Sequence, residues 1–169
     1  MLHKFSLHKI DNEKSFTFKP YEYSRFKYGD DQVAEKFGEE LASAFILEIL
    51  QSYNLENIQM VVISSPYSFI PTATFSMKNY FVNFLNRWLV KQKYLPVQES
   101  KIHRTVTYKE DYGNLTKDER IALIKNDEFQ IEKTFLDNKL ILFLDDIRIT
   151  GSHEKMIQTT LEKFKIEND

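Results

Sequence analysis

The sequence predicts an α/β fold in which a doubly wound, mainly parallel sheet carries helices on both faces. Two short, largely apolar runs, Ile58–Ile63 and Leu140–Leu144, indicate buried strands, because parallel strands covered on both faces appear as nearly continuous apolar segments. A helical pattern follows each run after a polar loop, which is the order of a strand–helix–strand unit. Ligands in such sheets bind beyond the carboxyl ends of the strands, so the loops after these runs are where we expect a site.

Composition limits the class of protein. A chain of 169 residues with 42% apolar content fits one compact domain over residues 1–169. The net charge of −2 argues against a nucleic-acid partner. The absence of cysteine excludes a disulfide framework, a thiol nucleophile and cysteine-ligated metal, and suits a reducing compartment. No secretory signal and no run of eighteen apolar residues is present, so we expect a soluble, cytoplasmic protein without a membrane segment.

The first 28 residues contain short aromatic and apolar runs. Phe5–Ile10 and Ser15–Phe18 are strand-like and flank a polar Asp-Asn-Glu turn, which predicts a hairpin. We interpret Tyr21–Tyr28 as a strand or coil packed over the core. The functional alternative is that Arg25 and Lys27 of this stretch meet an anionic group.

The rest of the chain gives alternating helix and strand signals. Apolar residues at helical spacing predict a helix from Asp31 to about Tyr53 and another from Thr72 to Tyr94. A β-branched, alternating stretch predicts a strand at Lys101–Tyr108, and a capping-box pattern predicts a helix at 117–125. A short edge strand is expected at Phe129–Ile131, and a last helix from Ser152 to about residue 164.

The stretch that begins with the strand Leu140–Leu144 has the most informative local order. Two carboxylates, Asp145 and Asp146, follow the strand, and a turn then leads through Gly151 to a helix start. The free N–H groups and the dipole of a helix N-terminus favour an anion, and glycine lets the backbone approach a ligand closely. The carboxylates suit hydroxyl groups or a cation. Alternatively, the acids only end a strand and Ser152 only caps a helix.

This stretch resembles the phosphoribosyl-pyrophosphate (PRPP) loop of the type I phosphoribosyltransferases. That signature is a hydrophobic strand, two acids, a hydrophobic residue, two variable residues, then Thr-Gly and a small hydroxyl residue; here it stands as LILFL-DD-I-RI-TGS. The resemblance implies that the acids bind the ribose 2′ and 3′ hydroxyls, that the Thr-Gly-Ser turn holds the 5′-phosphate, and that residues 1–28 form a hood beside a core at 29–169. The implied catalytic residues are Asp145 and Asp146, and the implied PRPP-binding residues are Arg148, Ile149, Thr150, Gly151 and Ser152.

Two further loops correspond in position to loops of that family. The resemblance places pyrophosphate at the loop after the first strand, where the hydroxyls of Ser64, Ser65 and Ser68 are candidates although the loop has no glycine, arginine or lysine. The alternative is a rigid connection bounded by prolines. The resemblance also implies a mobile loop near residues 108–114, with Arg104 and Lys109 as basic candidates for pyrophosphate. Alternatively, these residues are ordinary solvated charges.

The resemblance implies a phosphoribosyltransferase that binds PRPP with Mg²⁺ and attaches phosphoribose to a nucleobase-like or other nitrogenous acceptor, releasing pyrophosphate. Mg²⁺ keeps few protein carboxylates, so we expect the metal to be carried on PRPP. The alternative is a regulatory, non-catalytic protein that binds PRPP or a nucleotide. The unusual loop after the first strand, Arg148 and the short C-terminus favour this alternative. A receiver-like domain with a fortuitous acidic pair is a third option.

Three features depart from the family pattern. Two more core strands normally follow the motif, so this chain is either a truncated form or covers its central edge in another way. Arg148 replaces an apolar or small residue and needs an anion: Asp145 or Asp146, an acid of a second subunit in a homodimer, or a ligand. Ile149 stands where members acting on 6-oxopurines tend to carry an Asp.

Overall fold

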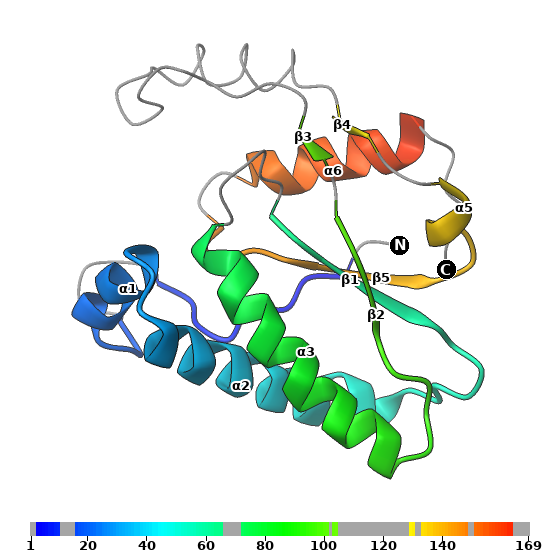
Figure 1. Cartoon of the computed structure of the whole chain (residues 1–169), viewed down its shortest axis with the longest axis horizontal. Helices are drawn as coiled ribbons and strands as arrows, with labels where there is room; N and C mark the ends of the chain where they lie inside the picture. The colour runs from blue at the N-terminus through cyan, green and yellow to red at the C-terminus, as the bar shows by residue number, and fades with distance from the viewer. Residues whose placement is uncertain are drawn as a thin grey trace.

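The central sheet has three parallel strands in the order β2-β1-β5. The computed structural model describes residues 3–10, 16–65, 72–101, 103–104, 129–130, 133–148 and 151–163 (Figure 1). Strand β1 (Met60–Ser64) lies between β2 (Gln98–Ser100) and β5 (Leu140–Leu144). The predicted α/β class and parallel pairing are therefore confirmed, and the sheet is small.

Helices cover both faces of this sheet, as a doubly wound fold requires (Figure 1). Helices α2 (Asp31–Glu48) and α3 (Ala73–Lys91) pack on one face, where β1 presents Met60 and Val62. Helix α6 (Ser152–Lys163) packs on the other face through Ile157, together with the short helix α5 (Lys133–Leu136), and there β1 presents Val61 and Ile63. Successive side chains of a strand point to opposite faces, so a strand covered on both faces must be apolar throughout.

Helices α2 and α3 approach each other closely at Gly38. A Cβ atom at this position would lie 2.5 Å from the backbone oxygen of Met77 and 2.8 Å from Cβ of Tyr80. Neither atom can move without shifting helix α3, so only glycine fits here.

Gly38→Ala is therefore expected to destabilise the protein by about 1–3 kcal/mol, the usual cost of overpacking a well-packed core. Urea unfolding measures this change. The matched control is Glu35→Ala, an exposed position on the same helix that should stay within about 0.5 kcal/mol of the wild type. Equal stability of the Gly38 variant and the wild type would show that the two helices do not meet as described.

The N-terminal segment differs from the prediction. Neither 3–10 nor 16–18 is a strand, so the predicted hairpin is wrong in the described residues. The two stretches nevertheless lie side by side, because Thr17 Oγ1 is 2.7 Å from His8 Nδ1 and the rings of His8 and Phe18 are 5.0 Å apart. Side-chain contacts join them in place of a backbone ladder.

Residues predicted as a strand or coil form helix α1 (Pro20–Lys27). Pro20 occupies its first turn, where the missing N–H costs nothing and the fixed φ suits a helix. Tyr23 and Phe26 are three residues apart and face the core, with Phe26 buried. Because aromatic and charged residues alternate along this stretch, the helical spacing of its buried side chains was not evident from the sequence.

The second strand of the sheet comes earlier than the predicted strand at Lys101–Tyr108. Strand β2 pairs with β1 from Gln98, directly after Val97, whose N–H donates to Oδ1 of Asn86 on α3 at 2.7 Å. This hydrogen bond holds Val97 against α3, and the chain joins the sheet at the next residue, Gln98. Strand β2 occupies the position outside β1, and the described part of the predicted strand, His103–Arg104, lies in a second sheet.

A second, two-stranded sheet pairs β3 (His103–Arg104) with β4 (Phe129–Gln130) in antiparallel orientation. The strand expected near Phe129–Ile131 thus exists, but it pairs with β3 and not with an edge of the main sheet. The predicted helix at 117–125 lies outside the described residues.

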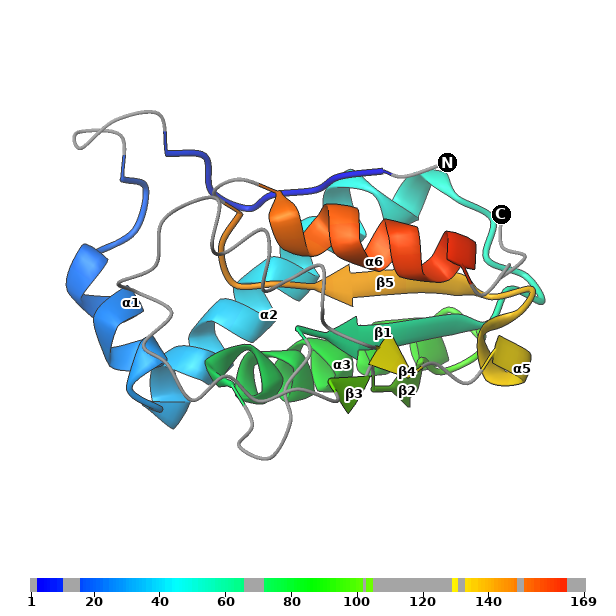
Figure 2. The same cartoon turned by 90° about the horizontal axis from the view of Figure 1, so that it is seen from above.

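The N-terminal segment, residues 3–10, passes the outer edge of β5 and contacts helices on both faces of the sheet (Figure 2). Lys4 forms an ion pair with Glu154 of α6 at 2.7 Å, and the ring of Phe5 lies 5.8 Å from that of Phe45 on α2. Since α6 and α2 cover opposite faces, the segment runs past the β5 edge to reach both.

No helix in the described ranges combines the length and apolar character needed to cross a membrane.

Candidate functional site

Two segments that are 80 residues apart meet at the carboxyl edge of the sheet. Ser64 pairs with Leu144 in the parallel ladder, so the residues that follow, Ser65 and Asp145, come together. The Ser65 hydroxyl donates to Oδ1 of Asp145 at 2.6 Å, and the same oxygen accepts the backbone N–H of Asp146 at 3.0 Å. Both serines are buried, with 7% of their surface exposed. One of the predicted serine hydroxyls therefore orients one of the predicted carboxylates.

Asp146 is held by three side chains from elsewhere in the chain. Oδ2 accepts the Tyr23 hydroxyl at 2.8 Å and the Lys27 ammonium at 2.6 Å, both from α1. Oδ1 lies 3.3 Å from the hydroxyl of buried Thr74 on α3. The Asp146 side chain is only 8% exposed, whereas that of Lys27 is 45% exposed. Asp146 thus points into the protein in this conformation.

Helix α1 brings both of its contacts to Asp146 because Tyr23 and Lys27 are four residues apart and share one helix face. Burial, followed by the charge of Asp146, raises the pKa of the Tyr23 hydroxyl, so it remains a protonated donor. Both basic residues of this stretch pair with acids of the chain itself, Lys27 with Asp146 and Arg25 with Asp30, and their contact with a ligand stays a prediction. Tyr23 was missed, because its shared helix face with Lys27 is evident only once the stretch is known to be a helix.

Arg148 pairs with an acid of its own chain that was not among the partners expected from the sequence. Its Nε donates to Oε2 of Glu154 in the first turn of α6 at 2.8 Å, and Lys4 reaches the other oxygen of this carboxylate. These two hydrogen bonds lower the pKa of Glu154. The Arg148 side chain also lies over Gly151, whose φ of +71° suits glycine and where a Cβ would be 3.0 Å from the guanidinium.

The start of α6 is positioned as the motif predicts. The Lys155 N–H donates to the carbonyl of Gly151 at 3.0 Å, which places Gly151 immediately before the first turn. Helix α3 also begins at this edge of the sheet, since Thr74 in its first turn contacts Asp146, and Thr72 makes no side-chain capping hydrogen bond. Two helix N-termini therefore point their free N–H groups and positive dipole ends at the carboxyl edge.

For several predicted site residues, the structure describes no side-chain position. Ile149, Thr150, Ser68 and Lys109 lie outside the described residues. Arg104 and Ser152 are placed by their backbone alone, in β3 and at the first position of α6. Their predicted roles remain predictions.

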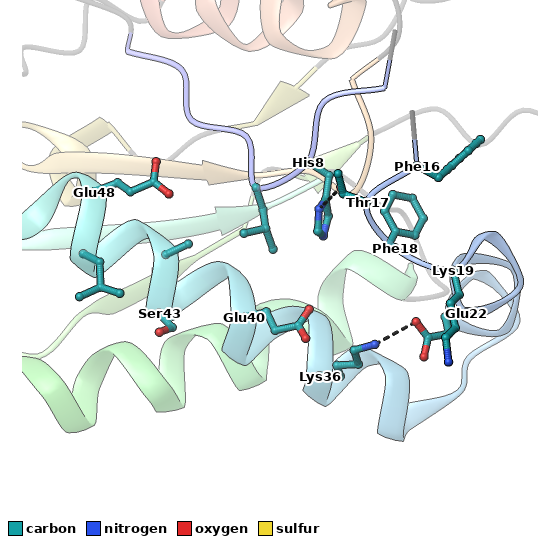
Figure 3. Close-up of a pocket in the computed structure, with 13 residues that line it drawn as sticks. His8, Phe16, Thr17, Phe18, Lys19, Glu22, Lys36, Glu40, Ser43 and Glu48 are labelled. Atoms are coloured by element: carbon teal, nitrogen blue, oxygen red, sulfur yellow. Dashed lines mark hydrogen bonds and ion pairs between the residues drawn. The ribbon is translucent and has the colours of Figure 1, made fainter. Parts of the chain in front are cut away.

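A separate open groove of about 830 Å³ lies between the N-terminal segment and α2 (Figure 3). His8 and Thr17 lie on one side, and Glu40 and Lys36 of α2 lie on the other. Burial lowers the pKa of His8, and its Nε2 has no hydrogen-bond partner among the residues that the structure describes. None of the described motif residues lines this groove, so it is distinct from the carboxylate pair.

Within the described residues, no cluster of three or more acidic or histidine side chains forms a ready-made metal cage. The adjacent carboxylates of Asp145 and Asp146 offer oxygen ligands, which Mg²⁺ prefers, but only two of them. This donor set fits a metal that brings most of its oxygen ligands with it, on a phosphorylated substrate or as water.

A parallel sheet with paired carboxylates and a helix start at its carboxyl edge is the arrangement that the resemblance to the type I phosphoribosyltransferases implies. The chain belongs to the ComF-like phosphoribosyltransferase family, whose model matches residues 1–169. Among solved structures, it is similar to a hypoxanthine phosphoribosyltransferase from Staphylococcus aureus, with 11% identity and a TM-score of 0.47. The similarity covers 82% of this chain and 60% of that protein, so the chain spans less than two thirds of its length. A comparison with curated proteins finds no match.

Proposed function

We propose that this protein binds PRPP at the carboxyl edge of β1 and β5 and transfers its phosphoribosyl group to a nitrogenous acceptor. The observation that carries the proposal is the arrangement at this edge: Asp145 oriented by Ser65, Asp146 beside it, and the Gly151 turn at the start of α6. The bond between ribose C1 and the pyrophosphate oxygen would break, and a bond from the acceptor nitrogen to C1 would form. Pyrophosphate leaves with the bonding electrons, and the acceptor loses its proton to solvent.

The chain's own contribution to such a reaction is positioning and charge stabilisation, since the transition state resembles an oxocarbenium ion. The carboxylates would accept hydrogen bonds from the ribose 2′ and 3′ hydroxyls and add negative charge near the electron-poor ring. The first turn of α6 would donate backbone N–H groups to the 5′-phosphate. Mg²⁺ bound to the substrate would neutralise charge on the leaving pyrophosphate.

A second candidate function has its own support. Asp146 is already bonded to Tyr23, Lys27 and Thr74, so one of the two acids is occupied without a ligand. A protein that binds PRPP and reports on it through α1, without transferring phosphoribose, would use the same contacts. Membership of a family does not decide between these two functions.

Release of pyrophosphate from PRPP separates the two. The purified full chain with Mg²⁺ is incubated with PRPP and a panel of purines, pyrimidines and small amines. Release that depends on the acceptor supports the transferase. PRPP binding without acceptor-dependent release supports the regulatory candidate, and no PRPP binding contradicts both.

The acceptor is expected not to be a 6-oxopurine. Position 149, just before the Thr of the motif, carries isoleucine, and an apolar side chain cannot exchange a proton with a purine nitrogen. We therefore expect hypoxanthine and guanine to be poor acceptors, turned over at least about 100-fold more slowly than the best acceptor. Parallel assays with Ile149→Asp provide the matched comparison. Rapid turnover of either base by the unmodified chain contradicts this expectation.

A further inference from the structure

The loop that follows β1 lacks the positive charge that a diphosphate group requires. Residues 64–71 are SSPYSFIP, without arginine, lysine or glycine. Diphosphate carries several negative charges, and proteins bind such groups with lysine or arginine as well as backbone N–H groups. If PRPP binds at this edge of the sheet, any basic side chain that contacts its diphosphate group must come from another element.

Lys78 of α3 is such a cation, placed at the carboxyl ends of two strands. It lines a cavity of about 240 Å³ with Ser64 at the end of β1, Ser100 at the end of β2, and Lys101. Only 5% of Lys78 is exposed. Pockets for drug-sized molecules usually measure about 300–1,000 Å³, so this smaller cavity with a lysine in its lining suits a phosphate group better than a heterocycle.

The ion-pair partner of Lys78 is a half-exposed carboxylate that a ligand anion could replace. Its ammonium group pairs with the carboxylate of Glu99 on β2, and the ring of Phe75 lies 4.5 Å away. The Lys78 side chain is buried, whereas the Glu99 side chain is 46% exposed. A buried lysine needs an anion, because an unpaired buried charge is costly. Because the Glu99 side chain is half exposed, water could solvate its carboxylate if a ligand anion took its place beside Lys78.

The charges of the cavity favour this exchange. Among the described residues, the lining contains two lysines, Lys78 and Lys101, and one carboxylate, that of Glu99. Interactions between a buried cation and a multivalent anion are stronger than those at the surface, where water screens them. The hydroxyls of Ser64 and Ser100 are additional hydrogen-bond donors.

We propose that Lys78 binds the diphosphate group of PRPP, with Glu99 as the counter-ion that it releases when the ligand enters. This inference rests on the proposed function, because it assigns part of the same ligand. It replaces the missing basic residue of the loop after β1 with a residue of the following helix. The competing explanation is that Lys78 and Glu99 form a purely structural ion pair.

Calorimetric titration of the full chain with Mg²⁺ and three probes tests the inference: inorganic pyrophosphate, PRPP and ribose 5-phosphate. Lys78→Met keeps the length of the side chain and removes its charge. It should weaken binding of pyrophosphate and PRPP by at least about tenfold and change that of ribose 5-phosphate by less than about twofold. The matched control, Lys91→Met in the exposed last turn of the same helix, should change none of the three.

A second variant keeps the test informative if Lys78→Met does not fold. Glu99→Gln removes the competing carboxylate while leaving Lys78 in place, so it should tighten pyrophosphate binding by about threefold or more. A purely structural pair predicts the opposite pattern: both variants lower the melting temperature and neither changes pyrophosphate affinity relative to ribose 5-phosphate. That pattern overturns the inference.

The same titrations test PRPP binding at the carboxyl edge separately from diphosphate binding by Lys78. If the wild type binds pyrophosphate through Lys78 but neither PRPP nor ribose 5-phosphate, the proposed function fails and the anion site stands. If PRPP and ribose 5-phosphate bind and Lys78→Met weakens both equally or neither, the proposed function stands and the assignment of Lys78 fails. If the wild type binds none of the three probes, both fail.

Discussion

Replacing Asp145 and Asp146 together by asparagine is expected to weaken PRPP binding by roughly 100-fold or more, because each charge-assisted hydrogen bond contributes about 1.5–3 kcal/mol. The variant should still fold. Asparagine Oδ1 can accept the hydrogen bonds that Asp145 takes from Ser65 and from the backbone. The ion pair lost at Asp146 has a half-exposed partner in Lys27, and such pairs add little stability. Calorimetry and a melting curve measure the two quantities.

The matched control changes another adjacent pair of acids. Glu39 and Glu40 lie on α2, and Glu40 lines the groove shown in Figure 3. Their double replacement by glutamine alters the net charge equally and should leave PRPP affinity unchanged. A double asparagine variant that melts like the wild type and binds PRPP equally well would contradict the assignment of the acidic pair.

Freeing Asp146 from α1 is expected to tighten PRPP binding. In the described conformation, Tyr23 and Lys27 occupy the oxygen that a ribose hydroxyl would need. A ligand that must first displace them binds with an affinity reduced by the fraction of molecules in the open state. We expect Tyr23→Phe combined with Lys27→Met to bind PRPP about five- to tenfold more tightly, which corresponds to about 1–1.4 kcal/mol.

Lys19→Met is the control for this variant, because Lys19 is exposed, precedes the same helix and contacts the ring of Tyr21. It should leave PRPP affinity unchanged. Weaker PRPP binding by the Tyr23 and Lys27 variant would show that these side chains contact the ligand directly. The account of Asp146 as an acid blocked by α1 would then be wrong.

The features that the sequence predicted are those encoded locally. The strands β1 and β5 are covered on both faces. Strands of this kind appear in the sequence as nearly continuous apolar runs, and these runs indicated a parallel sheet. The turn at Gly151 followed by α6 is equally local. Local signals were misleading where side-chain contacts replaced backbone pairing, as at Thr17 and His8, and where an aromatic stretch concealed helix α1.

The features that the sequence could not predict depend on distant residues. Tyr23 and Asp146 are 123 positions apart, and no local pattern links them. Lys78 had a weak signal: it follows Thr74 by four residues on the buried face of α3. A lysine among buried side chains indicates a nearby anion, but only the structure identifies that anion as Glu99 on β2.

The most direct test of the central claim is a crystal structure of the full chain with PRPP and Mg²⁺. We predict the ribose hydroxyls within hydrogen-bond distance of the carboxylates of Asp145 and Asp146, and the 5′-phosphate at the Gly151 turn before α6. Tyr23 and Lys27 should have moved away from Asp146. Density for PRPP in the groove beside His8, or at any place away from the carboxyl edge of β1 and β5, would contradict the account.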